Sequence, residues 1–289
     1  MRTVLLLLLL FGVLSAKSQI TVSDDTVVDA GTLLVKLRFD SHKRPPEQSY
    51  VAFEGKRYPA YPNPFDEEGG FYTLVPVRYG TRPHKTKLVI VEVNGKTKHY
   101  TTIPITIRSA HYRKERLHVD PSRAKISEKN RRRIRREANE AKAIYRHRTP
   151  RLYIDAPLSL PLQSKITSAF GTKRLFNGTL KSFHSGTDFR AATGTPIQTV
   201  ASGRVVLAKN RFFAGNSVII DHGEGIYTGY YHLSRFLVKK GDFVHEGEVI
   251  GLAGATGRVT GPHLHFTVHV NATLVDPLRF IDTFNRLFF

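Results

Sequence analysis

Short runs in which hydrophobic and polar residues alternate extend from residue 20 to residue 107 and predict β-strands. TLLVKLRF, GFYTLVPVRY and KLVIVEVN are such runs, and Gly, Pro and Asn residues separate them. Val93-Asn94-Gly95-Lys96 lies between two strand-like runs and predicts a hairpin turn, because an Asn-Gly pair tolerates the positive φ of a tight turn. We expect a small β-domain of immunoglobulin-like type over residues 19–110.

Residues 111–155 follow a different pattern, in which basic residues are dense, as in Arg131-Arg132-Arg133-Ile134-Arg135-Arg136. Apolar residues recur there every three or four positions and predict a helix from about Ser127 to Arg146. The members of this apolar stripe are Ile134, Ala138, Ala141, Ile144 and Tyr145. A nucleic-acid or membrane-surface helix is one interpretation. We favour a connector that docks by its stripe and turns its basic face toward an anionic cell wall.

From Ile166 onward the chain returns to strand patterns with closely spaced glycines, as in ASGRVVLA, NSVIIDHG, GIYTGYYHL and HLHFTVHV. These runs predict a compact, mostly antiparallel sheet. We place this C-terminal domain at residues 156–289. The predicted fold class is therefore mainly β, with residues 111–155 as a basic helical linker.

Residues 1–18 have the pattern of a secretory signal peptide. A positive charge precedes an apolar run from Val4 to Leu14, and small residues then predict cleavage near Ala16 to Ser18. No later stretch approaches the ~20 apolar residues of a membrane helix. We expect export to the periplasm or cell envelope, without stable membrane insertion after cleavage; an uncleaved signal anchor is the minor alternative.

Composition restricts the chemistry and the partners of the chain. The sequence has no cysteine, so any metal must be held by histidines and carboxylates. Its formal net charge is +20, which indicates an acidic partner surface. Export favours an anionic lipid or cell-wall polymer as that partner, and we expect no nucleic acid.

Two pairs of polar residues in the C-terminal domain have spacings that fit a metal site. His184 and Asp188 in FHSGTDFR are four residues apart, and Gly186 between them favours a loop and strand. His263 and His265 in GPHLHFTV alternate along a strand, so both imidazoles face the same side. A carboxylate and two imidazoles would form a catalytic zinc site that leaves one position open. Spacing alone leaves structural roles open, because distant pairs need not meet.

The blocks around these pairs resemble the lysostaphin-type (LytM) zinc metallopeptidases, in the same order, over residues 166–277. The blocks are FHSGTDFRAATGTPIQTVASGRVV, NSVIIDHGEGIYTGYYHL, VKKGDFVHEGEVIGLAGATGRVTGPHLHF and VDP. SAFGTKRLFNG, just before them, resembles the version in Gram-negative cell-wall endopeptidases. The resemblance implies one zinc ion per chain, held by His184, Asp188 and His265. It makes His232 and His263 the catalytic histidines that do not bind the metal.

Three further positions depend on the same resemblance. Asn216 resembles a family residue near the substrate groove, and Tyr230 precedes His232 by two residues, which would put both on one strand face. Turn hydrogen bonding and sheet packing are the alternative roles of Asn216 and Tyr230. Thr267 occupies a place where many relatives carry an acidic residue, so we expect no carboxylate to support His265 from there.

The implied function is a zinc-dependent peptidoglycan endopeptidase that hydrolyses stem-peptide cross-links, with the D-alanyl to diaminopimelate bond as substrate. One alternative is a non-catalytic LytM-type protein that binds the wall or activates amidases. Another is a basic binding module with a vestigial metal site. The presence of all five expected histidine and aspartate positions favours the enzyme. Restraint of the groove by the N-terminal domain or by the basic helix is compatible with the sequence, which identifies no blocking side chain.

Overall fold

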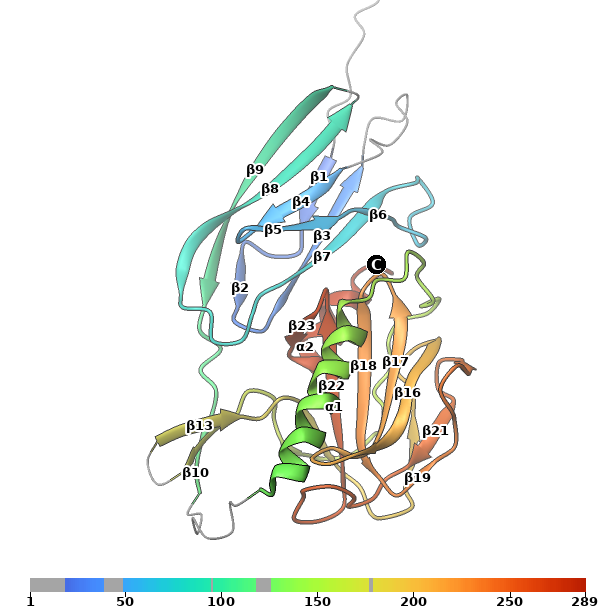
Figure 1. Cartoon of the computed structure of the whole chain (residues 1–289). Helices are drawn as coiled ribbons and strands as arrows, with labels where there is room; N and C mark the ends of the chain where they lie inside the picture. The colour runs from blue at the N-terminus through green and yellow to red at the C-terminus, as the bar shows by residue number, and fades with distance from the viewer. Residues whose placement is uncertain (1–18, 39–48, 95, 118–125, 177–178) are drawn as a thin grey trace, which may run out of the picture.

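The computed structural model describes residues 19–38, 49–94, 96–117, 126–176 and 179–289 (Figure 1). These residues form strands β1 to β23 and helices α1 and α2, so the expected mainly β fold is confirmed. The predicted signal peptide and Gly95 of the predicted turn lie outside the described residues. Neither helix of the described part is both long and apolar enough to cross a bilayer.

Strands β1 to β9 form two sheets that enclose a hydrophobic core (Figure 1). One sheet has the order β1-β3-β7-β6 and the other β2-β9-β8-β4-β5. The strands are β1 (Gln19–Val22), β2 (Thr26–Val28), β3 (Thr32–Arg38), β4 (Tyr50–Phe53), β5 (Lys56–Pro59), β6 (Tyr61–Pro62), β7 (Phe71–Pro76), β8 (His84–Asn94) and β9 (Thr97–Arg108). Leu33 and Val35 alternate along β3 and pack with Ile90 of β8 in this core. Asn94 pairs with Thr97, so the chain reverses where the sequence predicts a turn.

The C-terminal half is built on a sheet of antiparallel strands in the order β11-β14-β22-β18-β17-β16-β20, with β23 paired to β22. A smaller sheet has the order β15-β21-β19. The strands are β11 (Ile166–Ser168), β14 (Thr187–Arg190), β15 (Pro196–Gln198), β16 (Gly203–Arg211), β17 (Gly215–Gly223), β18 (Ile226–Leu233), β19 (Arg235–Phe236), β20 (Phe243–Val244), β21 (Val249–Leu252), β22 (His263–Val270) and β23 (Thr273–Val275). Leu264 and Phe266 of β22 are fully buried in the main core, as their alternation with the histidines predicts.

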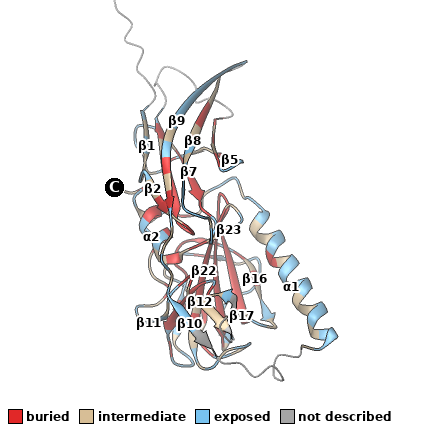
Figure 2. Cartoon of the chain, turned by 90° about the vertical axis from the view of Figure 1, so that its left-hand side faces the viewer, coloured by how far each residue is buried: buried red, intermediate tan, exposed pale blue. Residues whose placement is uncertain are grey.

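The two halves of the chain share this main core next to α2 (Pro277–Asn285), as the buried residues in Figure 2 indicate. Leu34 and Tyr72, on the sheet β1-β3-β7-β6, belong to the same buried cluster as Phe280 and Phe284 of α2. Each large side chain buried there stabilises the contact by about 1.5–3 kcal/mol. Removing residues 19–110 would therefore expose an apolar surface of the C-terminal half.

A three-stranded sheet links the halves close to the metal-ligand candidates. Its order is β10-β12-β13, with β10 (Lys114–Leu117), β12 (Lys173–Phe176) and β13 (Thr179–Phe183). Strand β10 runs parallel to β12, and β12 and β13 form a hairpin that leads directly into His184. Tyr79 of the N-terminal half stacks on Phe183, with 3.8 Å between ring centroids. Tyr112 and Phe170 complete this aromatic cluster, which fixes the hairpin against the N-terminal half.

Helix α1 (Glu128–Arg146) occupies the place predicted for the linker helix and lies over the large sheet (Figure 1). Ser127 caps its first turn by accepting a hydrogen bond from a backbone N–H. Ile144 and Tyr145 pack on a cluster that comprises Leu207, Ile219, Tyr227 and Tyr231. The docked part of the stripe therefore lies near the C-terminal end of the helix.

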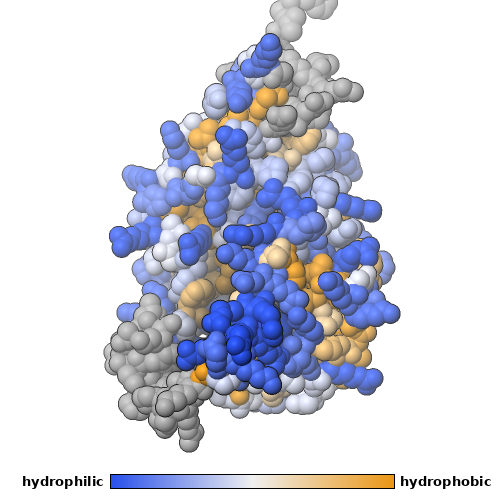
Figure 3. All heavy atoms as spheres, in the orientation of Figure 1, coloured by the Kyte–Doolittle hydropathy of each residue, from blue (hydrophilic) through white to orange (hydrophobic). Residues whose placement is uncertain are grey.

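The outer face of α1 is polar, and Figure 3 shows hydrophilic side chains gathered over this helix. Ala138 of the predicted stripe is exposed, so the stripe was wrong at this position. Glu137 is turned toward the sheet instead, where its carboxylate accepts a hydrogen bond from Phe212 N at 2.9 Å. The ion pair between Glu137 and Arg133 completes the contact.

Candidate metal centre

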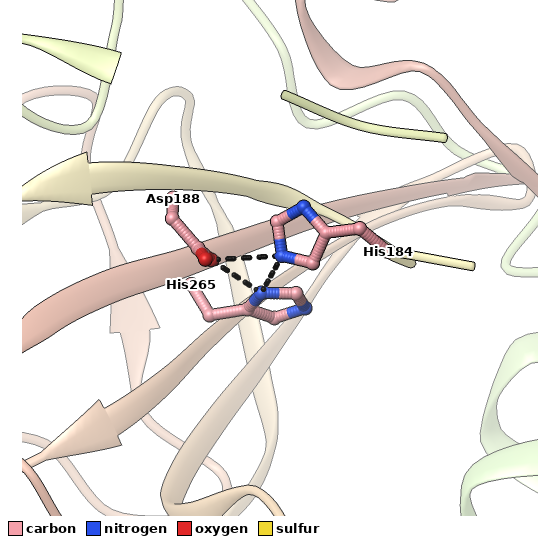
Figure 4. A group of neighbouring side chains, drawn as sticks. All are labelled: His184, Asp188 and His265. Atoms are coloured by element: carbon pink, nitrogen blue, oxygen red, sulfur yellow. Dashed lines mark hydrogen bonds and ion pairs between the residues drawn. The ribbon is translucent and has the colours of Figure 1, made fainter. Parts of the chain in front are cut away.

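Antiparallel pairing of β14 with β22 places Asp188 directly opposite His265. Figure 4 shows both side chains converging with His184, which lies just before β14. Asp188 Oδ1 is 2.7 Å from His265 Nδ1 and 3.0 Å from His184 Nε2, and the two histidine nitrogens are 3.0 Å apart. The three predicted ligand residues therefore present one atom each to a common point.

Backbone groups fix how two of these side chains are oriented. His184 Nδ1 lies 3.0 Å from the Ala169 carbonyl oxygen, to which it donates in the tautomer that leaves a lone pair on Nε2. Gly186 gives the His265 ring its room, because a Cβ there would lie 2.7 Å from His265 Nε2 and 2.4 Å from the Phe266 carbonyl oxygen. Glycine at this position is thus a requirement of the site's packing.

The donor set fits a divalent metal of the zinc type. Two imidazole nitrogens and one carboxylate oxygen are typical zinc ligands, and three protein ligands leave a fourth position open. A cation bound there would take the place of the protons that the hydrogen bonds from His184 Nε2 and His265 Nδ1 share with Asp188 Oδ1. Burial raises the pKa of Asp188, but hydrogen bonds from His184 and His265 outweigh burial and hold the net pKa well below its usual value.

His263 lies at the edge of this centre on the same face of β22 as His265. Its Nδ1 is 2.9 Å from the Gly261 carbonyl oxygen, and its Nε2 is 3.7 Å from Asp188 Oδ1. When Nδ1 donates its proton to Gly261, Nε2 presents a lone pair beside the ligand cluster. His263 is therefore placed next to the metal-ligand candidates without being one of the three converging residues.

His232 also lies beside the three converging residues, because β18 contains a bulge. Val218 pairs with Tyr230 and Asn216 with Leu233, so β18 has one more residue than β17 in this interval. His232 has a φ of 63°, which turns its side chain toward the site; the ring centroid is 4.9 Å from that of His263.

Backbone contact and burial also set the state of the His232 imidazole. Its Nδ1 is 2.9 Å from the Thr256 carbonyl oxygen, so Nε2 is the nitrogen left for chemistry. Burial lowers the pKa of His232 to about 4, with further lowering by His265 and His263, against the hydrogen bond to Thr256. His232 is thus neutral at neutral pH in the protein alone.

Tyr230 and Asn216, the two predicted substrate-binding residues, do not line the space around the converging histidines. Tyr230 is 0% exposed, and its hydroxyl accepts a hydrogen bond from Val200 N at 3.0 Å, so contact with a substrate does not fit the structure. Asn216 bridges the chain instead: its amide donates to the Ser234 carbonyl and accepts from Asn210. The structural alternatives, sheet packing for Tyr230 and turn hydrogen bonding for Asn216, agree with these contacts.

Tyr231 lies on the same face of the large sheet as His265. The sequence pattern did not single it out. Tyr231 pairs with His265 across β18 and β22, with 5.7 Å between ring centroids. Thr267 Oγ1 donates to its hydroxyl at 3.3 Å, so Thr267 supports a tyrosine here and not His265. Tyr145 of α1 lies on the other side of this hydroxyl and stacks on His269 at 3.6 Å. The contacts of Tyr231 with Thr267 and Tyr145 follow from the strand register and cannot be derived from the local sequence pattern.

The metal centre opens into two adjoining hollows, which together we call the groove. One hollow extends toward α1 and is lined by Tyr145, Tyr231, His232, Arg258 and His269, among others. The other extends toward β10 and is lined by Arg113, Lys114, Ser168 and Pro262, among others. Both hollows are lined by Glu115, Arg174, Asp188, Thr260 and His263, so the groove passes across the metal centre.

Fold and site together define a metallopeptidase-type domain, and comparisons with known proteins agree. Residues 182–277 match peptidase family M23, and all five histidine and aspartate positions lie within this match. The chain belongs to peptidase family M23. The catalytic domain of lysostaphin from Staphylococcus simulans is 36% identical to it, with 92% of that domain and 41% of this chain covered and a TM-score of 0.36.

Two other relatives extend this likeness. A crystal structure of a Pseudomonas aeruginosa protein described as peptidase M23 is 29% identical, with a TM-score of 0.66 and coverage of 89% of this chain and 95% of that one. The peptidoglycan DD-endopeptidase ShyA of Vibrio cholerae is 47% identical over 122 residues, which cover 41% of this chain. The chain spans only 28% of the length of ShyA.

Proposed function

We propose that this protein is a zinc-dependent endopeptidase that hydrolyses stem-peptide cross-links in peptidoglycan, at the bond between D-alanine and diaminopimelate. The observation that carries the proposal is the convergence of His184, Asp188 and His265, with two further histidines beside them. The name of the relative ShyA supports the substrate class.

In this proposal one zinc ion is held by His184 Nε2, an Asp188 carboxylate oxygen and His265 Nδ1. When bound, zinc supplies Lewis acidity toward a water molecule and toward the carbonyl oxygen of the peptide bond. The chain contributes the carboxylate charge and the orientation of both imidazoles. Ala169 holds the tautomer of His184, and Gly186 leaves space for the ring of His265.

His232 and His263 are the proposed acid and base. Each ties Nδ1 to a backbone carbonyl, of Thr256 and Gly261 respectively, so each presents Nε2 to the groove. One imidazole, in its neutral form, accepts the proton of the attacking water on Nε2. The other, in its imidazolium form, donates a hydrogen bond from Nε2–H to the developing oxyanion and passes that proton to the leaving amine. Histidine suits both tasks because its ordinary pKa lies near neutral pH.

The proposed location is the periplasm or another part of the cell envelope, after removal of residues 1–18 as a signal peptide. The apolar run from Val4 to Leu14 supports export, and a peptidoglycan substrate is reached outside the cytoplasmic membrane. The positive net charge of +20 supports attraction to a wall that carries free carboxylates.

The test is digestion of purified Gram-negative peptidoglycan, followed by identification of the released muropeptides by mass. We expect the zinc-loaded protein to convert cross-linked dimers into monomers and His184→Ala to leave them intact. His245→Ala, an exposed histidine of the same half, is the matched control and should retain activity. If the zinc-loaded protein binds peptidoglycan but releases no monomers, the proposed hydrolysis is wrong and a binding or activating role replaces it.

A further inference from the structure

Arg174 lies beside the metal centre and has no role in the chemistry described above. Its position on β12 is paired with Glu115 of β10 on one side and with Ser182 of β13 on the other. Its side chain lines both hollows of the groove, as do Asp188 and His263. A molecule lying across the metal centre would therefore pass this guanidinium.

The guanidinium of Arg174 has unused hydrogen-bonding capacity. Its Nε is buried and has no hydrogen-bond partner among the described residues. The closest carboxylate, that of Glu115, is 3.7 Å away, well beyond the ~2.7–2.9 Å of a charge-assisted hydrogen bond. An arginine presents a planar fork of donors that matches a carboxylate in two parallel hydrogen bonds. Because the Arg174 side chain is 36% exposed although its Nε is buried, its outer Nη groups can bind an additional anion from the groove.

The surrounding charges favour an anionic group on this side. Arg113 and Lys114, from the linker just before and within β10, line the same hollow as Arg174. Glu115 and Asp188 are the acids among the residues that line it, and Asp188 is a proposed metal ligand. The hollow toward β10 therefore keeps an excess of positive charge for a ligand.

The chemistry of the proposed substrate supplies a matching group. In a D-alanyl to diaminopimelate cross-link, the carbon that bears the leaving amine also bears a free carboxylate. The same holds for the terminal D-alanine of an uncross-linked D-alanyl-D-alanine stem peptide. In a polyglycine bridge the corresponding carbonyl continues into the next peptide bond and carries no charge. A carboxylate receptor beside the metal would accept the first two and discriminate against the third.

We propose that Arg174 is the specificity-determining residue that binds the free carboxylate next to the scissile bond, on the side of the leaving amine. This inference rests on the proposed function. Arg174 takes two donor positions to that carboxylate, and Glu115, whose ion pair with Arg174 is loose, competes with the substrate for it. A stem peptide that ends in D-alanyl-D-alanine presents the same carboxylate to Arg174.

The test uses the full chain and a soluble muropeptide dimer in two forms, one with the diaminopimelate carboxylate next to the cross-link free and one with it converted to an amide. For the free acid, Arg174→Ala should raise KM about tenfold or more, since a lost charge-assisted pair is worth at least one factor of ten. For the amide, the variant and the unmodified protein should have equal KM. Arg174→Lys keeps the charge but loses the fork, so its KM for the free acid should lie between those of the unmodified protein and Arg174→Ala.

Two matched variants separate recognition from general effects. Glu115→Gln should lower KM for the free acid, because it removes the competing carboxylate, and leave KM for the amide unchanged. Arg235→Ala removes an exposed arginine on β19 and should change neither value. Equal KM for acid and amide with the unmodified protein would overturn the role of Arg174 while leaving the proposed hydrolysis intact. If Arg174→Ala and Arg174→Lys each lose the acid and the amide as substrates to the same extent, the role of Arg174 is overturned too.

Binding measured without turnover keeps the inference independent of the proposed function. Titration of chelator-treated, metal-free protein with the two dimers should give a Kd for the acid about tenfold lower than for the amide. Arg174→Ala should abolish this difference. A metal-free protein that binds both forms equally would overturn the inference, whatever the outcome of the hydrolysis experiment.

Discussion

The hydroxyl of Tyr145 in α1 lies 2.9 Å from the hydroxyl of Tyr231 in β18. Tyr231 pairs in turn with His265, and the ring of Tyr145 stacks on His269. A residue of the basic linker helix is therefore in contact with the strand face that carries a proposed metal ligand. The helix forms part of the groove wall, in addition to joining the two halves of the chain.

This contact predicts a graded effect of substitutions at Tyr145. Tyr145→Phe removes one hydrogen bond and should lower the free energy of unfolding by about 1 kcal/mol. Tyr145→Ala also removes the ring from its cluster and should cost roughly 3 kcal/mol. Urea denaturation of both variants measures these values. Tyr100→Ala, at a residue that is 64% exposed, is the control and should stay within about 0.5 kcal/mol of the unmodified protein; equal losses at both sites would contradict the docking of α1.

Gly186 gives a prediction about the metal centre itself. Gly186→Ala places a Cβ against His265 Nε2 and the Phe266 carbonyl oxygen, so the His265 ring must shift. We expect zinc affinity to fall by about 10- to 100-fold, the range for disturbed supports of metal ligands. Competition with a chromogenic chelator measures the affinity. Gly261→Ala is the matched control, because its Cβ would meet no atom within 4 Å; unchanged affinity in both variants would show that the ring does not need this space.

Glu224 predicts a pH dependence of stability at the contact between the two halves. Burial raises the pKa of Glu224 from 4.5 to about 7, and the hydrogen bond from the Tyr72 hydroxyl offsets only part of this increase. Between these two pH values the folded protein keeps a proton that the unfolded chain has released, so stability falls as pH rises through this window. Glu224→Gln removes the effect and should be more stable than the unmodified protein at pH 8, by roughly 1–3 kcal/mol.

The measurement for Glu224 is the unfolding free energy in urea at pH 5 and at pH 8. The two proteins should be similar at pH 5 and should differ at pH 8. Other groups titrate equally in both proteins, so the difference between them isolates Glu224. A variant that is less stable than the unmodified protein at pH 8 would mean that the ionised carboxylate stabilises this contact.

The sequence predicted the features that depend on local pattern. Alternation along HLHFTV placed His263 and His265 on one face and Phe266 in the core, and the structure has this arrangement. The helix begins and ends within one residue of the predicted Ser127 and Arg146. The mainly β class also follows from short strand patterns, because these are nearly independent of long-range contacts.

Features that depend on register were not predictable. The bulge in β18 shifts the alternation by one residue, so Tyr231 shares the site's face with His232 and Tyr230 enters the core. Counting back two residues from His232 therefore points to Tyr230, which is buried in the core, while Tyr231 is the tyrosine that pairs with His265. Arg174 was likewise hidden, because its place beside Asp188 depends on folding of a hairpin against the large sheet.

The measurement that tests the central claim most directly combines zinc content and turnover in His263→Ala. We expect this variant to bind one zinc ion per chain, because His263 is not among the three converging residues, and to lose its hydrolysis of cross-linked muropeptides almost completely, because its imidazole takes part in proton transfer. Zinc lost together with activity would contradict the assignment of His263 as a residue that does not bind the metal. Zinc retained with full activity would contradict its catalytic role.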